Sequence, residues 1–167
     1  MKIAITGPES SGKTELAIAL SGKLGWPYVP EAARWYLHKR NGSYSRSDLL
    51  EIAKLQYDWW MKTAQFSHSF ICDSDMVVVA VWELEKFGSL SQDLSKLLDS
   101  IRFDCVLLCA PDLPWEYDPL RENPHDRDRL FERYKEVLEA HDIPFAIVSG
   151  QGDERLALAQ QLIELRQ

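Results

Sequence analysis

The segment from Gly7 to Thr14 has the residue types and spacing of a phosphate-binding loop. It reads Gly-Pro-Glu-Ser-Ser-Gly-Lys-Thr, which matches G-x-x-x-x-G-K-[ST], and it stands between a strand-like apolar run and a helix-like run. The glycines let successive N–H groups turn toward one anion, and the following helix N-terminus adds partial positive charge. Lys13 is expected to reach the β- and γ-phosphates of ATP, and the Thr14 hydroxyl to bind Mg²⁺. The expected ATP-binding residues are Gly7, Glu9, Ser10, Ser11, Gly12, Lys13, Thr14 and, in a later glycine loop, Gly150.

Two acidic residues that follow expected strands are candidates for the chemistry at the transferred phosphate. Asp73 ends the apolar run 69–72, where a carboxylate suits Mg²⁺ beside Thr14. Transfer to a hydroxyl also needs a carboxylate that orients or accepts the hydroxyl proton. We favour Glu31 for this task and keep Asp73 as the alternative. Glu31 has a second interpretation, as a residue that begins a helix and interacts with its dipole.

Asp75 and Arg34 are the expected partners of these carboxylates on the acceptor side. Strand alternation would put Asp75 on the same side as Asp73. Asp75 then either contacts the substrate or caps the helix that starts at Met76. Arg34 lies one helical turn after Glu31, so the two side chains are expected to face the same pocket.

A segment of about residues 112–130 is expected to form a lid over the transferred phosphate. Charge on that group calls for arginines that close over it. Arg121 and Arg127 are the candidates, since Arg127 extends the apolar stripe of the following helix inward, whereas Arg129 and Arg133 fit a solvated charged face. Trp115 either stacks on a flat heterocycle or packs beneath the lid.

Alternating strand and helix patterns carry these residues. Apolar runs at 2–6, 26–30, 69–72, 105–109 and 145–148 read as strands, and the prolines of 26–30 suit an edge strand. Helices are expected at 13–24, 31–39, 76–86, 92–101, from Asn123 with Pro124 at its first position, and after 152. A further long helix follows a capping-box-like start at Ser45 and Asp48 and carries residues at helical spacing from Leu49 to Thr63. Strands that alternate with helices form parallel sheets covered on both faces. We expect an α/β fold, a P-loop kinase-like three-layer sandwich with a five-stranded parallel sheet, as one domain over residues 1–167.

The amino-acid composition limits the classes of binding partner that are expected. The net charge is −7 without a basic block, so neither nucleic acid nor a membrane is an expected partner. The three cysteines lie in apolar runs and are expected to be reduced thiols of a cytoplasmic protein. The chain starts with strand and loop patterns, so we expect no signal peptide. It contains no N-K-x-D motif, and ATP is therefore the expected nucleotide. The sequence does not indicate an oligomeric state.

Several segments in order resemble the ribosylnicotinamide kinase domain of NadR-type proteins. They are Gly7–Thr14, Tyr28-Val29-Pro30-Glu31-Ala32-Ala33-Arg34, Asp73-Ser74-Asp75, Asp112-Leu113-Pro114-Trp115, Leu120-Arg121-Glu122-Asn123-Pro124, Arg127, Gly150 and Glu154-Arg155. The resemblance implies Mg²⁺- and ATP-dependent phosphorylation of the 5′-hydroxyl of nicotinamide riboside, which gives nicotinamide mononucleotide. It also implies that Trp115 helps to hold the nicotinamide ring. We do not expect this chain alone to make NAD.

Two other functions fit the same residues. A kinase for another nucleoside or a nucleoside monophosphate would use the same loop and lid. A non-catalytic ATP-binding switch or sensor would need the loop but no second pocket, so Glu31 and Arg34 count against it.

Overall fold

The computed structural model describes residues 1–40, 43–100, 102–119, 121 and 125–166. Its elements, in chain order, are β1 (Lys2–Thr6), α1 (Lys13–Leu24), β2 (Tyr28–Val29), α2 (Ala32–His38), α3 (Arg46–Ala64), β3 (Phe70–Asp73), α4 (Met76–Phe87), α5 (Gln92–Ser100), β4 (Cys105–Cys109), α6 (Arg127–Ala140), β5 (Ala146–Val148) and α7 (Gly152–Glu164).

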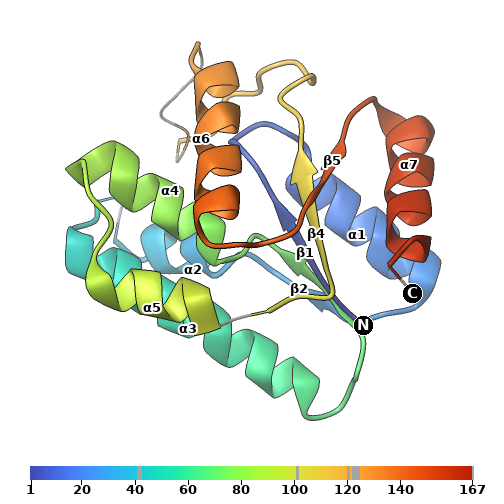
Figure 1. Cartoon of the computed structure of the whole chain (residues 1–167), viewed down its shortest axis with the longest axis horizontal. Coiled ribbons are helices and arrows are strands. Elements are labelled where there is room, and N and C mark those ends of the chain that lie inside the picture. Colours follow the sequence, from blue (N-terminus) through green and yellow to red (C-terminus); the bar gives the residue numbers. More distant parts are fainter. Residues whose placement is uncertain (41–42, 101, 120, 122–124, 167) are drawn as a thin grey trace.

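The five strands form one parallel sheet in the order β2-β3-β1-β4-β5. β1 is central, with Ile3 opposite Ile71 of β3 and Cys105 of β4. Helices α1 and α7 cover one face, and α2 to α6 lie on the other (Figure 1). Each face has its own apolar core, and all five residues of β4 are buried. The predicted three-layer sandwich with a five-stranded parallel sheet is confirmed.

Local signals explain why several elements begin and end where predicted. β1, α1 and β4 have the predicted bounds. Gly25 and Gly88 end α1 and α4 in the left-handed conformation, which glycine adopts without steric cost. The predicted capping box at the start of α3 is present, and the Ser45 N–H donates to the Asp48 carboxylate at 2.8 Å. The predicted edge strand is β2, between Pro27 and Pro30.

The predicted start of α6 is wrong. The helix begins at Arg127 after Asp126, rather than at Pro124 after an Asn123 cap. Asn123 and Pro124 themselves lie outside the described residues. The first helical hydrogen bond runs from the Leu130 N–H to the Asp126 carbonyl, and the Arg129 guanidinium binds the Asp126 carboxylate at 2.7 Å.

The strand alternation expected to link Asp73 with Asp75 is also wrong. β3 ends at Asp73, and Ser74 has a left-handed backbone with φ of 71°. This turn breaks the two-residue period, so the two carboxylates do not share a strand face. Ser74 is nonetheless buried, and its N–H donates to the Ile5 carbonyl at 3.0 Å.

Within the described residues, no helix has both the length and the apolar character needed to span a bilayer.

Candidate active site

The phosphate-binding loop connects β1 to α1 at the carboxyl edge of the sheet (Figure 1). Gly7 has φ of 135°, and a Cβ there would lie 2.7 Å from the Cys109 carbonyl oxygen, so glycine is needed for both reasons. Gly12 also has a left-handed backbone, with φ of 74°. The Lys13 Nζ donates to the carbonyls of Gly7 at 2.9 Å and Pro8 at 2.7 Å. The Lys13 side chain therefore folds back onto the backbone of its own loop.

A cavity of about 720 Å³ joins this loop to the residues expected on the acceptor side. The predicted site residues that line it are Glu9, Ser10, Ser11, Gly12, Lys13, Thr14, Glu31, Arg34 and Arg121. Its other walls include Leu37 of α2, Val78 and Trp82 of α4, Tyr134 of α6 and the loop residues Leu113, Pro114 and Glu116. Gly7, Asp73, Asp75, Trp115, Arg127 and Gly150 are not among the lining residues of this cavity.

Glu31 and Arg34 form an ion pair on the wall of the cavity. Arg34 Nε lies 3.2 Å from Glu31 Oε2, and its Nη1 lies 2.7 Å from Asp118 in the loop after β4. Only 12% of the Glu31 side chain is exposed. Burial raises the pKa of Glu31 above its ordinary 4.5, whereas the nearby Lys13 charge lowers it. Glu31 is thus a desolvated carboxylate that faces a cation of the phosphate loop, which suits a proton acceptor.

Asp73 is buried at the end of β3 and is held by a residue that sequence reasoning missed. The Tyr28 hydroxyl donates to Asp73 Oδ2 at 3.0 Å, whereas Oδ1 is buried and has no hydrogen-bond partner. Burial, followed by the Asp73 charge, raises the pKa of Tyr28, so the phenol stays a donor. A buried oxygen without a donor suits a cation or its water ligand, and Mg²⁺ takes few protein ligands. The Asp73 carboxylate therefore fits the metal expected with ATP, and Thr14, its expected partner, lines the cavity.

Asp75 caps α4. Its carboxylate accepts from the Val77 N–H at 3.1 Å, and its side chain is buried. Burial raises its pKa to about 6. Of the two roles left open by the sequence, the observed geometry is that of the helix cap.

Arg121 and Arg127 both contact Ser10 of the phosphate loop. Arg121 Nη1 donates to Ser10 Oγ at 3.2 Å, and Arg127 Nη1 donates to the carbonyls of Ser10 at 3.0 Å and Leu113 at 2.8 Å. Both guanidinium carbons lie 5.9 Å from the centre of the Trp115 ring, within cation–π range. Trp115 therefore lies within cation–π distance of both arginines expected in the lid.

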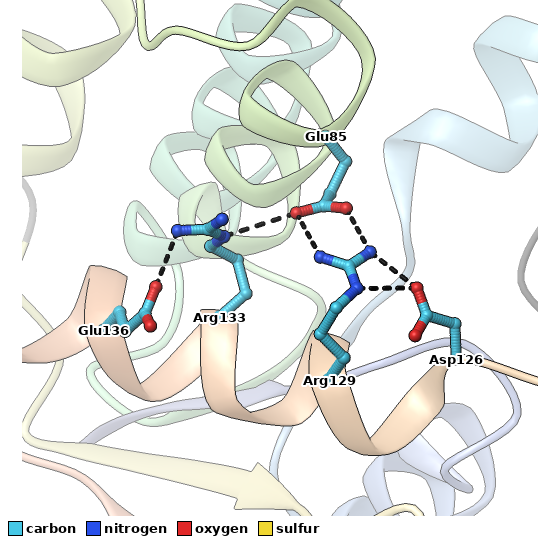
Figure 2. A network of polar contacts seen from close by, with 5 residues as sticks. All are labelled: Glu85, Asp126, Arg129, Arg133 and Glu136. Atoms are coloured by element: carbon cyan, nitrogen blue, oxygen red, sulfur yellow. Dashed lines mark hydrogen bonds and ion pairs between the residues drawn. The ribbon is translucent and has the colours of Figure 1, made fainter.

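Arg129 and Arg133 are directed away from this site, onto α4 (Figure 2). Arg129 binds both carboxylate oxygens of Glu85 and also Asp126, while Arg133 binds Glu85 and Glu136. The two arginines were expected on a solvated charged face, and their contacts with Glu85 were not foreseen. These ion pairs fasten the first turns of α6, next to Arg127, to the adjacent helix.

Arg155 is a second residue without a role in the sequence prediction. It is 4% exposed and donates to the Ser11 carbonyl at 2.8 Å and to Asp112 at 2.7 Å. Its position holds a signal that could have identified it, because Arg155, Ala159 and Ile163 form the buried stripe of α7 at four-residue spacing. An arginine on an apolar helix stripe requires acceptors inside the protein.

A family model described as an AAA domain matches residues 2–155. The chain belongs to this family. The AAA domain here is 30% identical over 171 residues to the trifunctional NAD biosynthesis/regulator protein NadR of Escherichia coli K12, covering 96% of this chain and 41% of that protein. The chain thus spans less than half the length of this relative, and the predicted resemblance to NadR-type proteins is confirmed.

Solved structures share the AAA-domain fold of this chain. A NadR protein in complex with NR has a TM-score of 0.80 at 20% identity, over 99% of this chain and 51% of that one. A NadR protein in complex with NAD and AMP-PNP gives 0.81 at 20% identity, over 99% and 49%. Thymidylate kinase from Ehrlichia chaffeensis gives 0.68 at 16% identity, over 100% and 98%. The P-loop kinase fold is therefore shown.

Proposed function

We propose that this protein is an ATP-dependent kinase that phosphorylates the 5′-hydroxyl of nicotinamide riboside to give nicotinamide mononucleotide. The observation that carries the proposal is the cavity in which the phosphate loop with Lys13 faces the largely buried carboxylate of Glu31. A phosphate-binding wall and a proton-accepting wall are the two halves that phosphoryl transfer to a hydroxyl requires. The 30% identity to NadR and the fold shared with an NR-bound NadR support the choice of acceptor.

Each proposed site residue has a defined task in this reaction. Lys13 and the loop amides hold the β- and γ-phosphates. Thr14 and Asp73 would hold Mg²⁺, which would neutralise charge on the phosphates. Glu31 orients the 5′-hydroxyl and accepts its proton as the oxygen bonds to the γ-phosphorus. The bond from that phosphorus to the β–γ bridging oxygen breaks, and ADP leaves. Arg121 and Arg127 stabilise charge on the transferred group from the segment 112–130.

Four other residues were predicted at the site, namely Arg34, Asp75, Trp115 and Gly150. Arg34 and Asp75 were predicted on the acceptor side; we retain Arg34, which positions Glu31, and assign Asp75 to the helix cap. Trp115 does not line the cavity, so contact with the nicotinamide ring would require its side chain to turn toward the acceptor. Gly150 is proposed to contact ATP from the loop after β5. The proposed unit of function is one domain, residues 1–167, acting in the cytoplasm on small molecules.

The charges on the cavity favour a nucleoside over a nucleoside monophosphate as acceptor. The lining includes the cations Lys13 and Arg121, which are assigned to ATP, and on the acceptor side Glu31 with Arg34, whose guanidinium is already bound to Glu31 and Asp118. A phosphate on an acceptor placed beside Glu31 would meet this carboxylate, and like charges repel. A cationic base such as nicotinamide in its riboside is compatible with it. This argues against the alternative of a monophosphate kinase.

The test is ADP formation with nicotinamide riboside, adenosine, cytidine, uridine and deoxythymidine monophosphate as acceptors, with product identity checked by mass spectrometry. We expect nicotinamide riboside to give the highest kcat/KM. The variant Lys13→Met should abolish turnover with every acceptor. A faster reaction with another nucleoside would overturn the acceptor. ATP binding without turnover on any acceptor would instead support a switch or sensor.

A further inference from the structure

One buried guanidinium ties together the ends of three strands. Arg155 Nη1 donates to Asp112 Oδ1 at 2.7 Å and to the Gly150 carbonyl at 2.8 Å, and Nη2 donates to the carbonyls of Ser11 at 2.8 Å and Ala110 at 3.3 Å. Ser11 lies in the loop after β1, Ala110 directly follows β4, and Gly150 follows β5. Four acceptors from three separate segments therefore converge on a side chain with 5% exposure.

Asp112 completes this arrangement from its second oxygen. Its Oδ2 accepts from the Gly150 N–H at 2.7 Å, while Oδ1 binds Arg155. Gly150 is thus held through both its N–H and its carbonyl, in a left-handed conformation with φ of 89°. The Arg155 charge is compensated, as a buried charge must be. The pair fixes the Gly150 backbone and the phosphate loop relative to each other.

The contact to Ser11 determines where an amide of the phosphate loop points. In a trans peptide the C=O and the following N–H are directed oppositely. Because Arg155 binds the Ser11 carbonyl, the Gly12 N–H is directed to the other side of the peptide, away from Arg155. Phosphate binding by such loops depends on N–H groups that point at the anion before it arrives.

We propose that Arg155 and Asp112 are positioning residues that orient the phosphate-loop amides and couple this loop to the Gly150 loop. They act on nucleotide binding through the backbone and touch neither the reacting hydroxyl nor the γ-phosphorus. The inference rests on the proposed function only in that the ligand is a nucleotide. It concerns the phosphate half of the site, whatever the acceptor.

Arg155→Lys separates the geometry from the charge. A lysine keeps the positive charge but lacks the planar fork that reaches Ser11, Asp112 and Gly150 together. Loss of a charge-assisted hydrogen bond corresponds to about tenfold or more in affinity. We therefore expect Arg155→Lys to weaken binding of both Mg-ADP and tripolyphosphate by about tenfold in titration calorimetry. Tripolyphosphate has no base, so its loss of affinity would locate the defect in the phosphate cradle.

Arg46→Lys is the control for loss of an arginine fork outside the site, although Arg46 is more exposed than Arg155. Arg46 also binds a buried carboxylate, Glu83 at 3.3 Å, and a backbone carbonyl, that of Ser89 at 2.9 Å, and it does not line the cavity. We expect this variant to lower the melting temperature without changing the affinity for either ligand. If Arg155→Lys does the same, Arg155 is only a structural residue and the proposal is overturned.

If Arg155→Lys does not fold, Asp112→Asn provides a second test of the proposal. It retains the shape and removes the carboxylate charge, so tripolyphosphate binding should weaken in the same direction. Unchanged affinity in folded Asp112→Asn would contradict the coupling. In the double variant the two losses should not add, because both substitutions disrupt one network.

Acceptor measurements keep this inference distinct from the proposed function. In Arg155→Lys the KM for ATP should rise, whereas the KM for nicotinamide riboside should change by less than about twofold, since distant sites act independently. If the wild-type protein does not turn over nicotinamide riboside, the proposed function fails, and the ADP and tripolyphosphate titrations still decide the role of Arg155.

Discussion

At the scale of single residues, Glu31 and Asp73 are two carboxylates in different surroundings. Glu31 faces Lys13 and Arg34 from the cavity wall, whereas Asp73 is buried at the end of β3 with one oxygen on the Tyr28 hydroxyl. Pairs of acids in unlike environments can divide the tasks of a reaction. We assign proton acceptance to Glu31 and the metal to Asp73, and each assignment has its own test.

Glu31→Gln should lower kcat with nicotinamide riboside by about 100-fold or more, the size of a general-base contribution. Glutamine keeps the shape of the side chain but cannot accept the proton. The affinity for Mg-ADP should stay within about twofold, because the phosphate loop is untouched. Equal kcat in the variant and the wild-type protein would assign the base to Asp73.

The acid limb of the pH profile should report the raised pKa of Glu31. Burial moves this pKa above 4.5, so kcat/KM should fall, as the pH is lowered, at a higher pH than for an exposed glutamate. Arg34→Gln removes a cation that lowers the pKa of Glu31, and should move the limb to still higher pH. A limb that does not move in Arg34→Gln would show that another group titrates.

The raised pKa of Glu31 also affects folding stability, and its contribution favours the folded state at low pH. The folded state binds the Glu31 proton more tightly than the unfolded state, so this contribution is fully present below pH 4.5. It is lost as the pH rises through the raised pKa. The site therefore holds an ionised carboxylate at a cost in folding free energy.

Tyr28→Phe tests the orientation of Asp73. Without the hydroxyl, Asp73 Oδ2 loses its donor at 3.0 Å, and the carboxylate is free to turn. We expect the affinity for Mn²⁺ in the presence of ADP, measured by electron paramagnetic resonance, to fall by about tenfold, the lower end of effects from residues that orient metal ligands. Affinity for metal-free ADP should not change. An unaltered Mn²⁺ affinity would leave Tyr28 with a packing role only.

At the scale of elements, α6 is fastened to α4 by ion pairs close to the lid arginine. Arg129 binds Glu85 through two nitrogen atoms, two residues after Arg127 reaches the phosphate loop (Figure 2). Glu85→Gln should reduce the free energy of unfolding by at most about 1 kcal/mol, because these pairs are partly exposed. It should also raise the KM for ATP a few-fold as the first turn of α6 loosens, an effect that should diminish in high salt.

The control for this prediction is Glu51→Gln, which breaks an exposed pair with Lys54 on α3. It should leave the KM for ATP unchanged. An equal KM effect in both variants would mean that general charge, rather than the attachment of α6, is responsible.

Elements with strong local signals were predictable. The glycines after α1 and α4 and the Ser45–Asp48 box give their bounds without reference to the rest of the chain. The start of α6 was not predictable in this way, because Asn123-Pro124 is itself a good local start signal. The helix instead starts after Asp126, whose carboxylate binds Arg129, and Arg129 also binds Glu85, which lies forty-four residues earlier in the chain. Local propensity is overridden where such tertiary contacts are made.

At the scale of the whole molecule, two apolar cores share the central sheet. β1, β3 and β4 contribute to both cores, so neither half is expected to unfold alone. Urea unfolding should give one transition with coincident fluorescence and circular dichroism curves. Mg-ADP at 100 times its dissociation constant should stabilise the fold by about 2.7 kcal/mol. Two separated transitions would contradict the single-domain proposal for residues 1–167.

The candidate site was predictable where a strand end carries a charged residue, because parallel strands bring their carboxyl ends together. This rule brought the phosphate loop and Glu31 to one cavity. It could not give Tyr28 as the partner of Asp73, or the direction in which Trp115 packs. Those contacts depend on side-chain rotamers and on loops whose shape is not encoded in periodicity.

The long-range contact made by Arg155 also has a consequence for folding of the chain during its synthesis. The contact from Arg155 to Ser11 joins residues 144 positions apart, so the backbone of the phosphate loop lacks its final support until α7 has packed. Contacts of this separation form late, because a long chain must close before they are made. A nascent or truncated chain that ends before residue 155 carries the complete loop motif, yet it should bind ATP poorly. Nucleotide retention by ribosome-bound chains of increasing length would then mark the moment at which folding is complete.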